Sequence, residues 1–334
     1  MKIFSKHLQT AGSIAMAALG ACAIGWLVED AGTDEIRSIF TEAAPFILVA
    51  LVLEGVRIVF EALGTQALLG DAKRRVAWST IFRIQLVSYA VAMTLPAGRA
   101  AAEATKAAAL QPHVGLGRGV AIGTFSQALN LMANATAAIP CVIAAYSLCG
   151  WSSTTWAVGT FSIMSMLLGL LVLAIVRSDR LAQWLSRSKK LAPKVANFRS
   201  ASAEFGIFPT KAFLAFFMAR CTEICVVTVL AAGVGLGLGL DTGLLVYGIQ
   251  ATATGAGEFV PGQIGVTEGA FRLAAPALGA PASTAVAVAL LAHLVQLAWV
   301  GAGSMAHVAS RLAGALRPSG EARTAAAPLP VAHS

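Results

Sequence analysis

Long apolar stretches separated by short charged segments are the feature of this 334-residue chain that most constrains its fold. A helix needs about 20 mostly apolar residues to cross the hydrocarbon core of a bilayer. Only 12% of the residues are charged, and a soluble fold with so few charges would expose large apolar patches. We therefore predict an all-α polytopic membrane protein. Its candidate membrane segments are 11–28, 43–64, 79–95, 120–148, 155–176, 209–232, 244–257 and 283–306.

Charges in the connecting segments indicate the side of the membrane on which each loop lies. Lys and Arg gather in 71–75, in 177–199 and in the C-terminal tail, whereas 29–42 is acidic. Cytoplasmic loops are enriched in Lys and Arg, so we expect these basic segments and both termini in the cytoplasm, at a bacterial inner membrane. The net charge of +8 then reflects topology and anionic lipid heads rather than nucleic acid.

Counting crossings from these loops leaves two stretches that begin and end on the same side. Residues 79–118 would start and finish in the cytoplasm, and 244–282 would start and finish outside. Each must turn inside the membrane, the first at Pro96 and the second at Pro261. Proline removes a backbone N–H, which suits a helix break. We predict six full crossings and two re-entrant helical hairpins within a domain over 1–310, followed by a disordered cytoplasmic tail over 311–334.

The two predicted turns have the same spacing. Glu103 lies seven residues after Pro96, and Glu268 lies seven residues after Pro261. Similar turns that enter from opposite faces indicate an inverted repeat, which places broken helices around a midplane site in many transporters. The helix that starts after each turn directs its positive N-terminal end at the break, and this favours an anionic head group.

Ionisable side chains within the predicted spans form clusters that mostly contain both signs of charge. An isolated charge is costly at membrane depth, so we expect them to face one polar interior. Near the turns, where charge and broken backbone coincide, we predict substrate binding; elsewhere structural ion pairs explain the charges equally well. The predicted binding residues are Arg99, Glu103, Lys106, Glu258, Pro261, Gly262, Glu268 and Arg272. The supporting charges are Glu54, Arg57, Arg83, Arg220 and Glu223, and Glu61 shares the helix face of the first two.

Other polar residues have simpler explanations. Gln127, Asn130 and Asn134 share one helix face, which indicates hydrogen bonding between helices. His293 and Gln296 are three residues apart, and a packed polar pair explains them better than a proton relay. The sequence has no metal-binding spacing such as H-E-x-x-H, and its five cysteines form no C-x-x-C pair, so we expect no metal and no cofactor.

The residues around the two turns carry a resemblance to a known family. The stretch Leu95–Ala107 has a Pro-x-Gly-Arg turn followed by a glutamate, and Glu258–Gly269 reads EFVPGQIGVTEG. They resemble the two motifs of the transmembrane region of lysylphosphatidylglycerol synthases and their flippase-like relatives, Pro-x-Arg-x-Gly-Glu and Pro-x-Pro-Gly-Gly-Ile-Gly-x-x-Glu. Phe259 and Gln263 replace a proline and a glycine of the second motif. The resemblance covers residues 10–310.

The resemblance implies that the protein moves an anionic or amphipathic membrane lipid between leaflets, through a polar cavity between the hairpins. No synthase domain follows the last predicted span, so we do not expect aminoacyl transfer from tRNA. One alternative is a non-transporting partner of a lipid or envelope biosynthesis complex, docked through 177–199. Another is an intramembrane lipid-modifying enzyme, although no nucleophile–base pair is visible. Abundant small residues would also allow a homo-oligomer.

Overall fold

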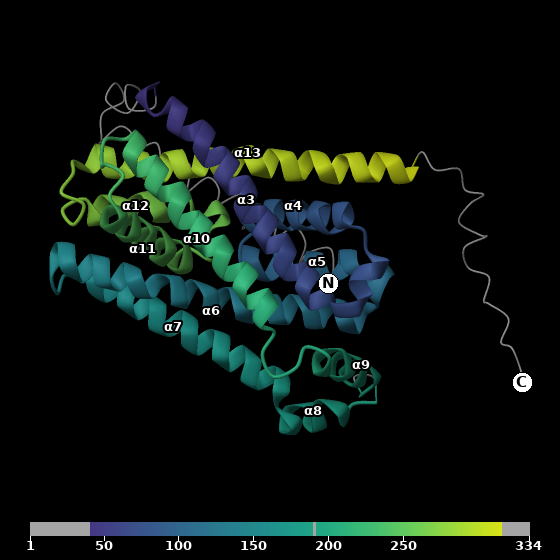
Figure 1. Cartoon of the computed structure of the whole chain (residues 1–334). Coiled ribbons are helices and arrows are strands. Elements are labelled where there is room, and N and C mark those ends of the chain that lie inside the picture. Colours follow the sequence, from purple (N-terminus) through teal and green to yellow (C-terminus); the bar gives the residue numbers. More distant parts are fainter. Residues whose placement is uncertain (1–40, 190–191, 316–334) are drawn as a thin grey trace, which may run out of the picture.

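The fold is all-α, as the sequence predicts (Figure 1). The computed structural model describes residues 41–189 and 192–315, and it shows no strand within them. The elements are α3 (Ala44–Leu69), η1 (Gly70–Arg75), α4 (Trp78–Thr94), α5 (Gly98–Val114), α6 (Leu116–Cys149), α7 (Ser153–Arg177), α8 (Asp179–Ser186), α9 (Ala192–Ala203), α10 (Thr210–Gly233), α11 (Leu240–Ala256), η2 (Pro261–Gln263), α12 (Val266–Ala274) and α13 (Ala282–Ala315).

The long helices coincide with the predicted crossings. In the described part of the chain, α6, α7, α10 and α13 are long and apolar enough to cross a membrane. The 26-residue α3 has a similar length but carries Glu54, Arg57 and Glu61 in its middle. Together these helices account for five of the six predicted crossings, and the sixth, at 11–28, lies outside the described residues, as do residues 316–334 of the predicted tail.

Two pairs of short helices form hairpins at opposite ends of the bundle. Figure 1 shows α4 and α5 toward the end where α3 finishes, and α11 and α12 toward the other end. Three of these helices have 17 residues and α12 has nine. At a rise of about 1.5 Å per residue, 17 residues span about 25 Å, less than the hydrocarbon core of about 30 Å. The hairpin tips meet midway, where the amide of Ala97 donates to the carbonyl of Glu258 at 3.1 Å.

Buried apolar side chains form three clusters that hold these elements together. One cluster joins α6, α7 and α10–α13 around Tyr247 and Phe271. A second joins α3–α7 with α10 around Phe125 and Phe216, and a third joins α3, α10 and α13. α3 and α10 approach closely at Gly64, because a Cβ there would lie 2.7 Å from the Phe216 ring. The hairpins are therefore packed inside the bundle and are not appended to it.

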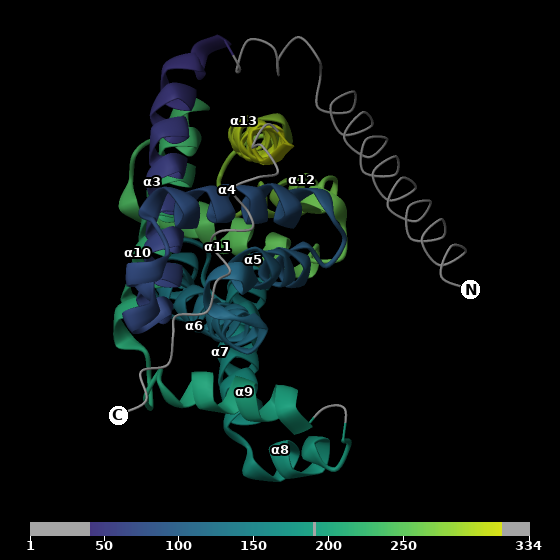
Figure 2. The ribbon, with the colours of Figure 1, turned by 90° about the vertical axis from the view of Figure 1, so that its right-hand side faces the viewer.

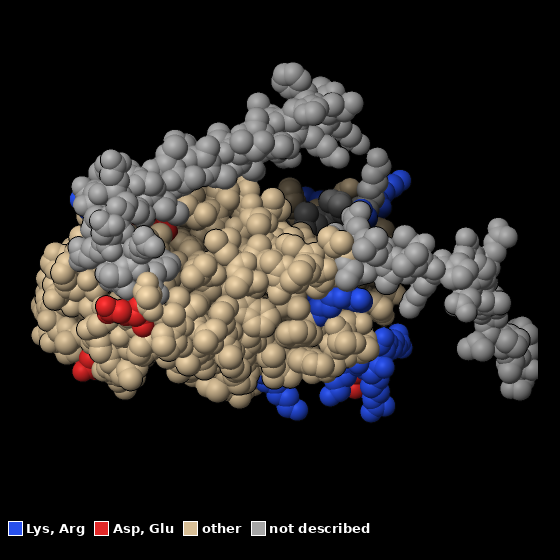
Figure 3. Space-filling view, turned by 90° about the horizontal axis from the view of Figure 1, so that it is seen from above, with Lys and Arg blue, Asp and Glu red and all other residues tan. Residues whose placement is uncertain are grey.

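On the face drawn in Figure 3, charged side chains gather at the two ends of the bundle and leave a band without charged residues between them. Figure 3 shows Lys and Arg at the end where α3 finishes and Asp and Glu at the opposite end. Lys73, Arg74 and Arg75 of η1 belong to the basic end. Seen from that end, α8 and α9 lie across the bundle beneath α6 and α7 (Figure 2). A band without charged residues between two charged ends is the surface expected of a membrane-embedded bundle.

Candidate functional site

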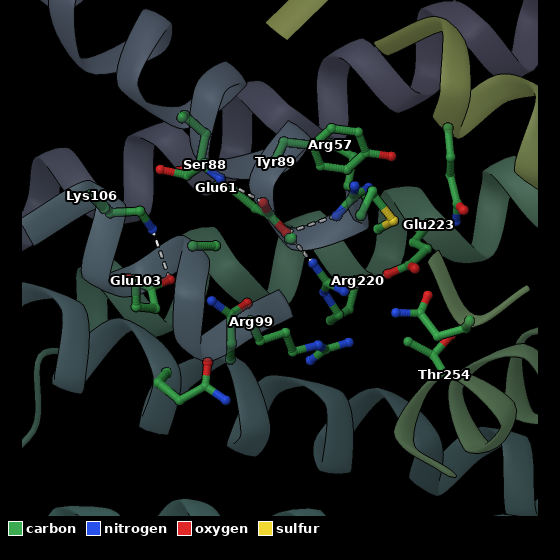
Figure 4. A pocket seen from close by; sticks show the side chains of 18 residues that line it. Arg57, Glu61, Ser88, Tyr89, Arg99, Glu103, Lys106, Arg220, Glu223 and Thr254 are labelled. Atoms are coloured by element: carbon green, nitrogen blue, oxygen red, sulfur yellow. Dashed lines mark hydrogen bonds and ion pairs between the residues drawn. The ribbon is translucent and has the colours of Figure 1, made fainter. Parts of the chain in front are cut away.

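A charged cavity lies at the meeting point of the two hairpins (Figure 4). The cavity is open on one side, and its empty space, including the solvent at that opening, is about 780 Å³; side chains from α3, α4, α5, α6, α10, α11, η2 and α13 line it. Its charged residues are Arg57, Arg99, Lys106, Arg220, Glu61, Glu103 and Glu223, and its amides are Gln85, Gln127, Asn130, Gln263 and Gln296. The cavity thus collects charges of both signs in the interior of a membrane bundle, where such groups are retained when they are paired.

Glu61 is the centre of the charge network. Its Oε1 accepts from Nη1 of Arg57 at 2.7 Å and from Nη2 of Arg220, and its Oε2 accepts from Nε2 of Gln85 at 2.8 Å. Figure 4 shows Glu61 between the two arginines. The carboxylate therefore ties α3 to α4 and to α10.

Each of the two buried arginines lies between two carboxylates. Arg57 also donates to both oxygens of Glu54, at 2.9 and 2.6 Å, and Nη1 of Arg220 donates to Glu223 at 2.6 Å. The Tyr89 hydroxyl donates to Glu54 at 2.8 Å, which orients that carboxylate. Bidentate arginine–carboxylate contacts fix geometry as well as charge, so this side of the cavity is a rigid wall.

Lys106 and Glu103 form a separate pair on α5. Nζ of Lys106 is 2.9 Å from Oε1 of Glu103, and the Lys106 side chain is only 3% exposed. Among the described residues, Oε2 of Glu103 and Oε1 of Gln85 are buried without a hydrogen-bond partner. A buried acceptor left unpaired is costly, so these two oxygens are places where a bound group could donate.

Arg99 and Glu258 connect the two hairpin tips. The backbone amide of Arg99 donates to Oε1 of Glu258 at 3.1 Å, and Nε of Arg99 is 3.4 Å from Oε2. The two side chains are 30% and 26% exposed, whereas those of Arg57 and Arg220 are 7% and 6% exposed. Arg99–Glu258 is therefore the looser and more accessible of these ion pairs.

The two turns share the same local backbone pattern. Leu95 and Val260, which precede the prolines, are extended, as expected before proline. The residues after the prolines, Ala97 and Gly262, are left-handed, with φ of 51° and 63°. α5 starts directly at Gly98, where a Cβ would lie 1.8 Å from the Ala92 carbonyl oxygen. Each turn thus ends one helix sharply and directs the chain back toward its starting side.

Glu268 occupies the matching position in the second hairpin but has a different role from Glu103. It is fully buried, and its Oε2 accepts from the Gly265 amide at 2.7 Å, which caps the start of α12. Its Oε1 is 2.7 Å from Nδ1 of His293 on α13. Nε2 of His293 is in turn 3.0 Å from the carbonyl oxygen of Gly262. Glu268 therefore ties the second turn to α13 and does not line the cavity.

The structure brings most of the predicted residues to the cavity. Those on its wall are Arg57, Arg99, Glu103, Lys106, Arg220 and Glu223. Glu54 and Glu258 bind two of these cations, and Pro261 and Gly262 form the buried turn beside Gln263. Of the three polar residues predicted on one helix face, Gln127 and Asn130 also line the cavity, whereas Asn134 is buried and does not line it.

Arg83, Glu268 and Arg272 lie away from the cavity wall, which corrects the expectation of one shared polar interior. Arg83 is exposed in the second turn of α4, eight residues after Arg75 of the basic η1, and its long side chain can reach water there. Arg272 is half-buried in the last turn of α12. His293 pairs with Glu268, so the predicted polar pair of His293 with Gln296 is also corrected.

The binding residues predicted from the sequence did not include the central group of the network. Glu61 lies one helical turn from Arg57, and its spacing alone could have identified it. Gln85 and Tyr89 lie four residues apart on α4, before the first turn. This spacing places them on one helix face, and it was the only signal in the sequence that could have grouped them. Gln263 lies at the position where the resembled motif has glycine. Among the described residues, no group of His, Cys, Asp and Glu could hold a metal ion.

Membrane-length helices around an internal charged cavity define this chain as a polytopic α-helical membrane protein. Residues 13–303 match the family model described as the lysylphosphatidylglycerol synthase TM region. The chain belongs to this family, which relates it to the handling of membrane lipids. A comparison with curated proteins finds no match.

Proposed function

We propose that the protein moves an anionic or zwitterionic lipid between the leaflets of a bacterial inner membrane, and that the head group passes through the charged cavity. The observation that carries this proposal is the position of the cavity. It lies partway along membrane-length helices, where the tips of two short hairpins meet, and four cations line it. Family membership supports a lipid as the substrate.

Two re-entrant hairpins in an inverted repeat would put the cavity near the middle of the membrane. The α4–α5 hairpin opens toward the basic end and the α11–α12 hairpin toward the opposite end (Figures 1 and 3). Basic loops favour the cytoplasm, so the end that carries η1, α8 and α9 would be cytoplasmic, together with both termini. In transporters, such broken helices bind substrate at the repeat interface.

The Arg99–Glu258 pair is the contact that a head group would enter. A phosphate can bind the guanidinium of Arg99 by accepting two parallel hydrogen bonds from it. An ammonium group of a zwitterionic lipid would then pair with Glu258. Because this pair joins the two hairpin tips, exchanging its partners would loosen the tips from each other and let the head group pass between them.

Lys106 and Glu103 would hold the head group further along α5. Lys106 can bind a phosphate oxygen, and the unpaired oxygens of Glu103 and Gln85 can accept from hydroxyl or ammonium groups. The Glu61 network would stay intact as a fixed wall, since both of its arginines are bound by two carboxylates each. Pro261, Gly262 and Arg272 would support the second hairpin without contacting the lipid.

The test is lipid exchange in liposomes that contain the purified protein and lipids with a fluorescent head group, both anionic and zwitterionic. An impermeant quencher then reports how fast label reaches the outer leaflet. We expect Arg99→Gln to slow exchange about tenfold or more, since a charge-assisted hydrogen bond contributes about 1.5–3 kcal/mol. Arg83→Gln is the matched control, because it removes an exposed arginine outside the cavity and should keep the wild-type rate.

Two results would contradict the proposal. Equal lipid exchange rates for Arg99→Gln and Arg83→Gln would mean that Arg99 does not bind the head group during transport. Wild-type exchange no faster than in protein-free liposomes, for both lipid classes, would contradict transport and favour a membrane partner of a lipid biosynthesis complex.

A further inference from the structure

The contact between Glu268 and His293 requires a proton that an ionised glutamate and a neutral histidine do not supply. Nε2 of His293 faces the carbonyl oxygen of Gly262 at 3.0 Å, and a carbonyl can only accept. Nε2 must therefore carry a hydrogen. Nδ1 faces a carboxyl oxygen of Glu268 at 2.7 Å, so a second hydrogen must lie between those two atoms.

The proton count does not depend on which atom holds that second hydrogen. Either His293 is an imidazolium beside a carboxylate, or a neutral imidazole accepts from a protonated Glu268. The pair as a whole has no net charge in both cases. Glu268 is fully buried and His293 is 8% exposed, and a neutral pair is the form that such burial favours.

Loss of the proton would break one of the two contacts. A neutral histidine next to an ionised glutamate leaves two acceptors facing each other, either at Nδ1 and the carboxylate or at Nε2 and the Gly262 carbonyl. Two apposed acceptors in a buried site repel, so α13 would separate from the second turn. The same turn packs against α4, because a Cβ on Gly262 would lie 3.2 Å from the Met93 carbonyl oxygen, and the next residue, Gln263, lines the cavity.

We propose that Glu268 and His293 form a proton-binding site that holds the second turn against α13 when loaded and releases it when empty. The site lies outside the cavity wall but acts on the turn that contributes Gln263 to it. Uptake and loss of this proton would in this way close and open the hairpin, which goes beyond lipid movement itself.

Several helices that pack against this pair also carry charged or titratable side chains. α13 packs against α4, which carries Arg83 and Tyr89, against α3, which carries Glu54, Arg57 and Glu61, and against α10, which carries Arg220 and Glu223. The other charged group of α12 is Arg272, and α11, which packs against α12, has Asp241 in its first turn and the buried Tyr247. η2 carries no ionisable side chain.

Glu268→Gln tests the proposal because glutamine can make the same contacts without an added proton. Its oxygen would accept from the Gly265 amide and its NH₂ would donate to Nδ1, so Nε2 of His293 would keep its hydrogen for Gly262. The measurement is amide hydrogen exchange of the segment 257–268, read by mass spectrometry on the two proteins at the same pH. Comparison at one pH cancels the intrinsic dependence of exchange on pH.

We expect equal exchange at about pH 6, and about tenfold faster exchange in the wild type at about pH 9, well above the ordinary histidine range. Equal exchange at both values would overturn the proposal. His293→Gln is the second variant, because it also removes the group that would release the proton. For each variant, the exchange rate at the two pH values is compared after correction for intrinsic rates. The difference for His293→Gln should match the difference for Glu268→Gln. The readout is the turn and not lipid movement, so it can fail or succeed independently of the proposed transport.

Discussion

Replacing Glu61 by glutamine tests whether the cavity network is a rigid, desolvated structure. Glu61 receives hydrogen bonds from Arg57, Arg220 and Gln85, and it is 13% exposed. Glutamine has the same shape and keeps one acceptor oxygen for the arginines. The Gln85 amide can turn over to accept from the new NH₂, because its own oxygen has no hydrogen-bond partner among the described residues. Glu61→Gln therefore removes mainly the charge.

The expected loss follows from the two arginine contacts. A charge-assisted hydrogen bond contributes about 1.5–3 kcal/mol, and one between two ionised partners lies near the top of this range whereas one with a single ionised partner lies near the bottom, so each contact loses about 1–1.5 kcal/mol. The total is about 2–3 kcal/mol. Glu61→Ala also leaves donors unpaired beside a void and should cost about 3–5 kcal/mol, the range for removal of one partner of a buried pair.

Thermal unfolding of the purified protein in detergent measures these losses. At about 2–3 °C per kcal/mol for a chain of this size, Glu61→Gln should lower the Tm by about 4–9 °C and Glu61→Ala by more. Glu204→Gln is the matched control, since Glu204 also pairs with an arginine, Arg118, but is 54% exposed. An exposed pair contributes at most about 1 kcal/mol, so its Tm should stay close to that of the wild type.

The order of the three variants decides the question. If Glu61→Gln, Glu61→Ala and Glu204→Gln all unfold within about 2 °C of the wild type, less than the shift expected per kcal/mol, then water screens the network and the cavity wall is not rigid. If only Glu61→Ala is destabilised, its packing matters and its charge does not.

The remaining predictions concern the two turns. Gly98→Ala should prevent correct folding of the first hairpin, seen as loss of monodisperse protein in size-exclusion chromatography, because its Cβ would lie 1.8 Å from the Ala92 carbonyl oxygen. Gly159→Ala, whose Cβ would meet no atom within 4 Å, should behave like the wild type. Gly262→Ala should lower stability by about 1–2 kcal/mol, because alanine is strained at φ 63°. Gly269→Ala in the neighbouring helix is its control, since a Cβ there meets nothing, and equal Tm values for the pair would contradict the strain argument.

The fold was predictable from the sequence because membrane segments obey two simple constraints, length and loop charge. The predicted segments 43–64, 120–148, 155–176, 209–232 and 283–306 each start within four residues of the first residue of one long helix. The hairpins were predicted by counting membrane crossings between loops on predicted sides, together with Pro96 and Pro261. The structure has helix breaks at both prolines. Their depth in a membrane and the repeat relation stay predictions.

The site was predictable only in part, because periodicity identifies faces of one helix but not the partners of each face. Charge and spacing identified Arg99, Glu103 and Lys106 as residues of one site. They did not show that Glu61 would meet Arg220 across two helices, a contact that depends on how α3 packs along α10. Equal spacing after a proline also suggested equal roles for Glu103 and Glu268, whereas α12 begins later after its turn than α5 does, which directs Glu268 at its own amide cap and at His293.

The cations of the cavity also bear on how the chain enters the membrane during synthesis. Three of them have a carboxylate partner three residues away on their own helix. These pairs are Arg57–Glu54, Lys106–Glu103 and Arg220–Glu223. A charge carried alone into the bilayer costs about 2.5–3.5 kcal/mol on insertion scales, and a counter-ion one turn away travels with it and neutralises it. These three cations can therefore be inserted with a counter-ion already in place, whereas Glu61 gains Arg220 only when α3 packs against α10. By contrast, Arg99 meets Glu258 only after both hairpins are in place, and His293 meets Glu268 only after α13 packs against the second hairpin, so these two contacts form late in assembly.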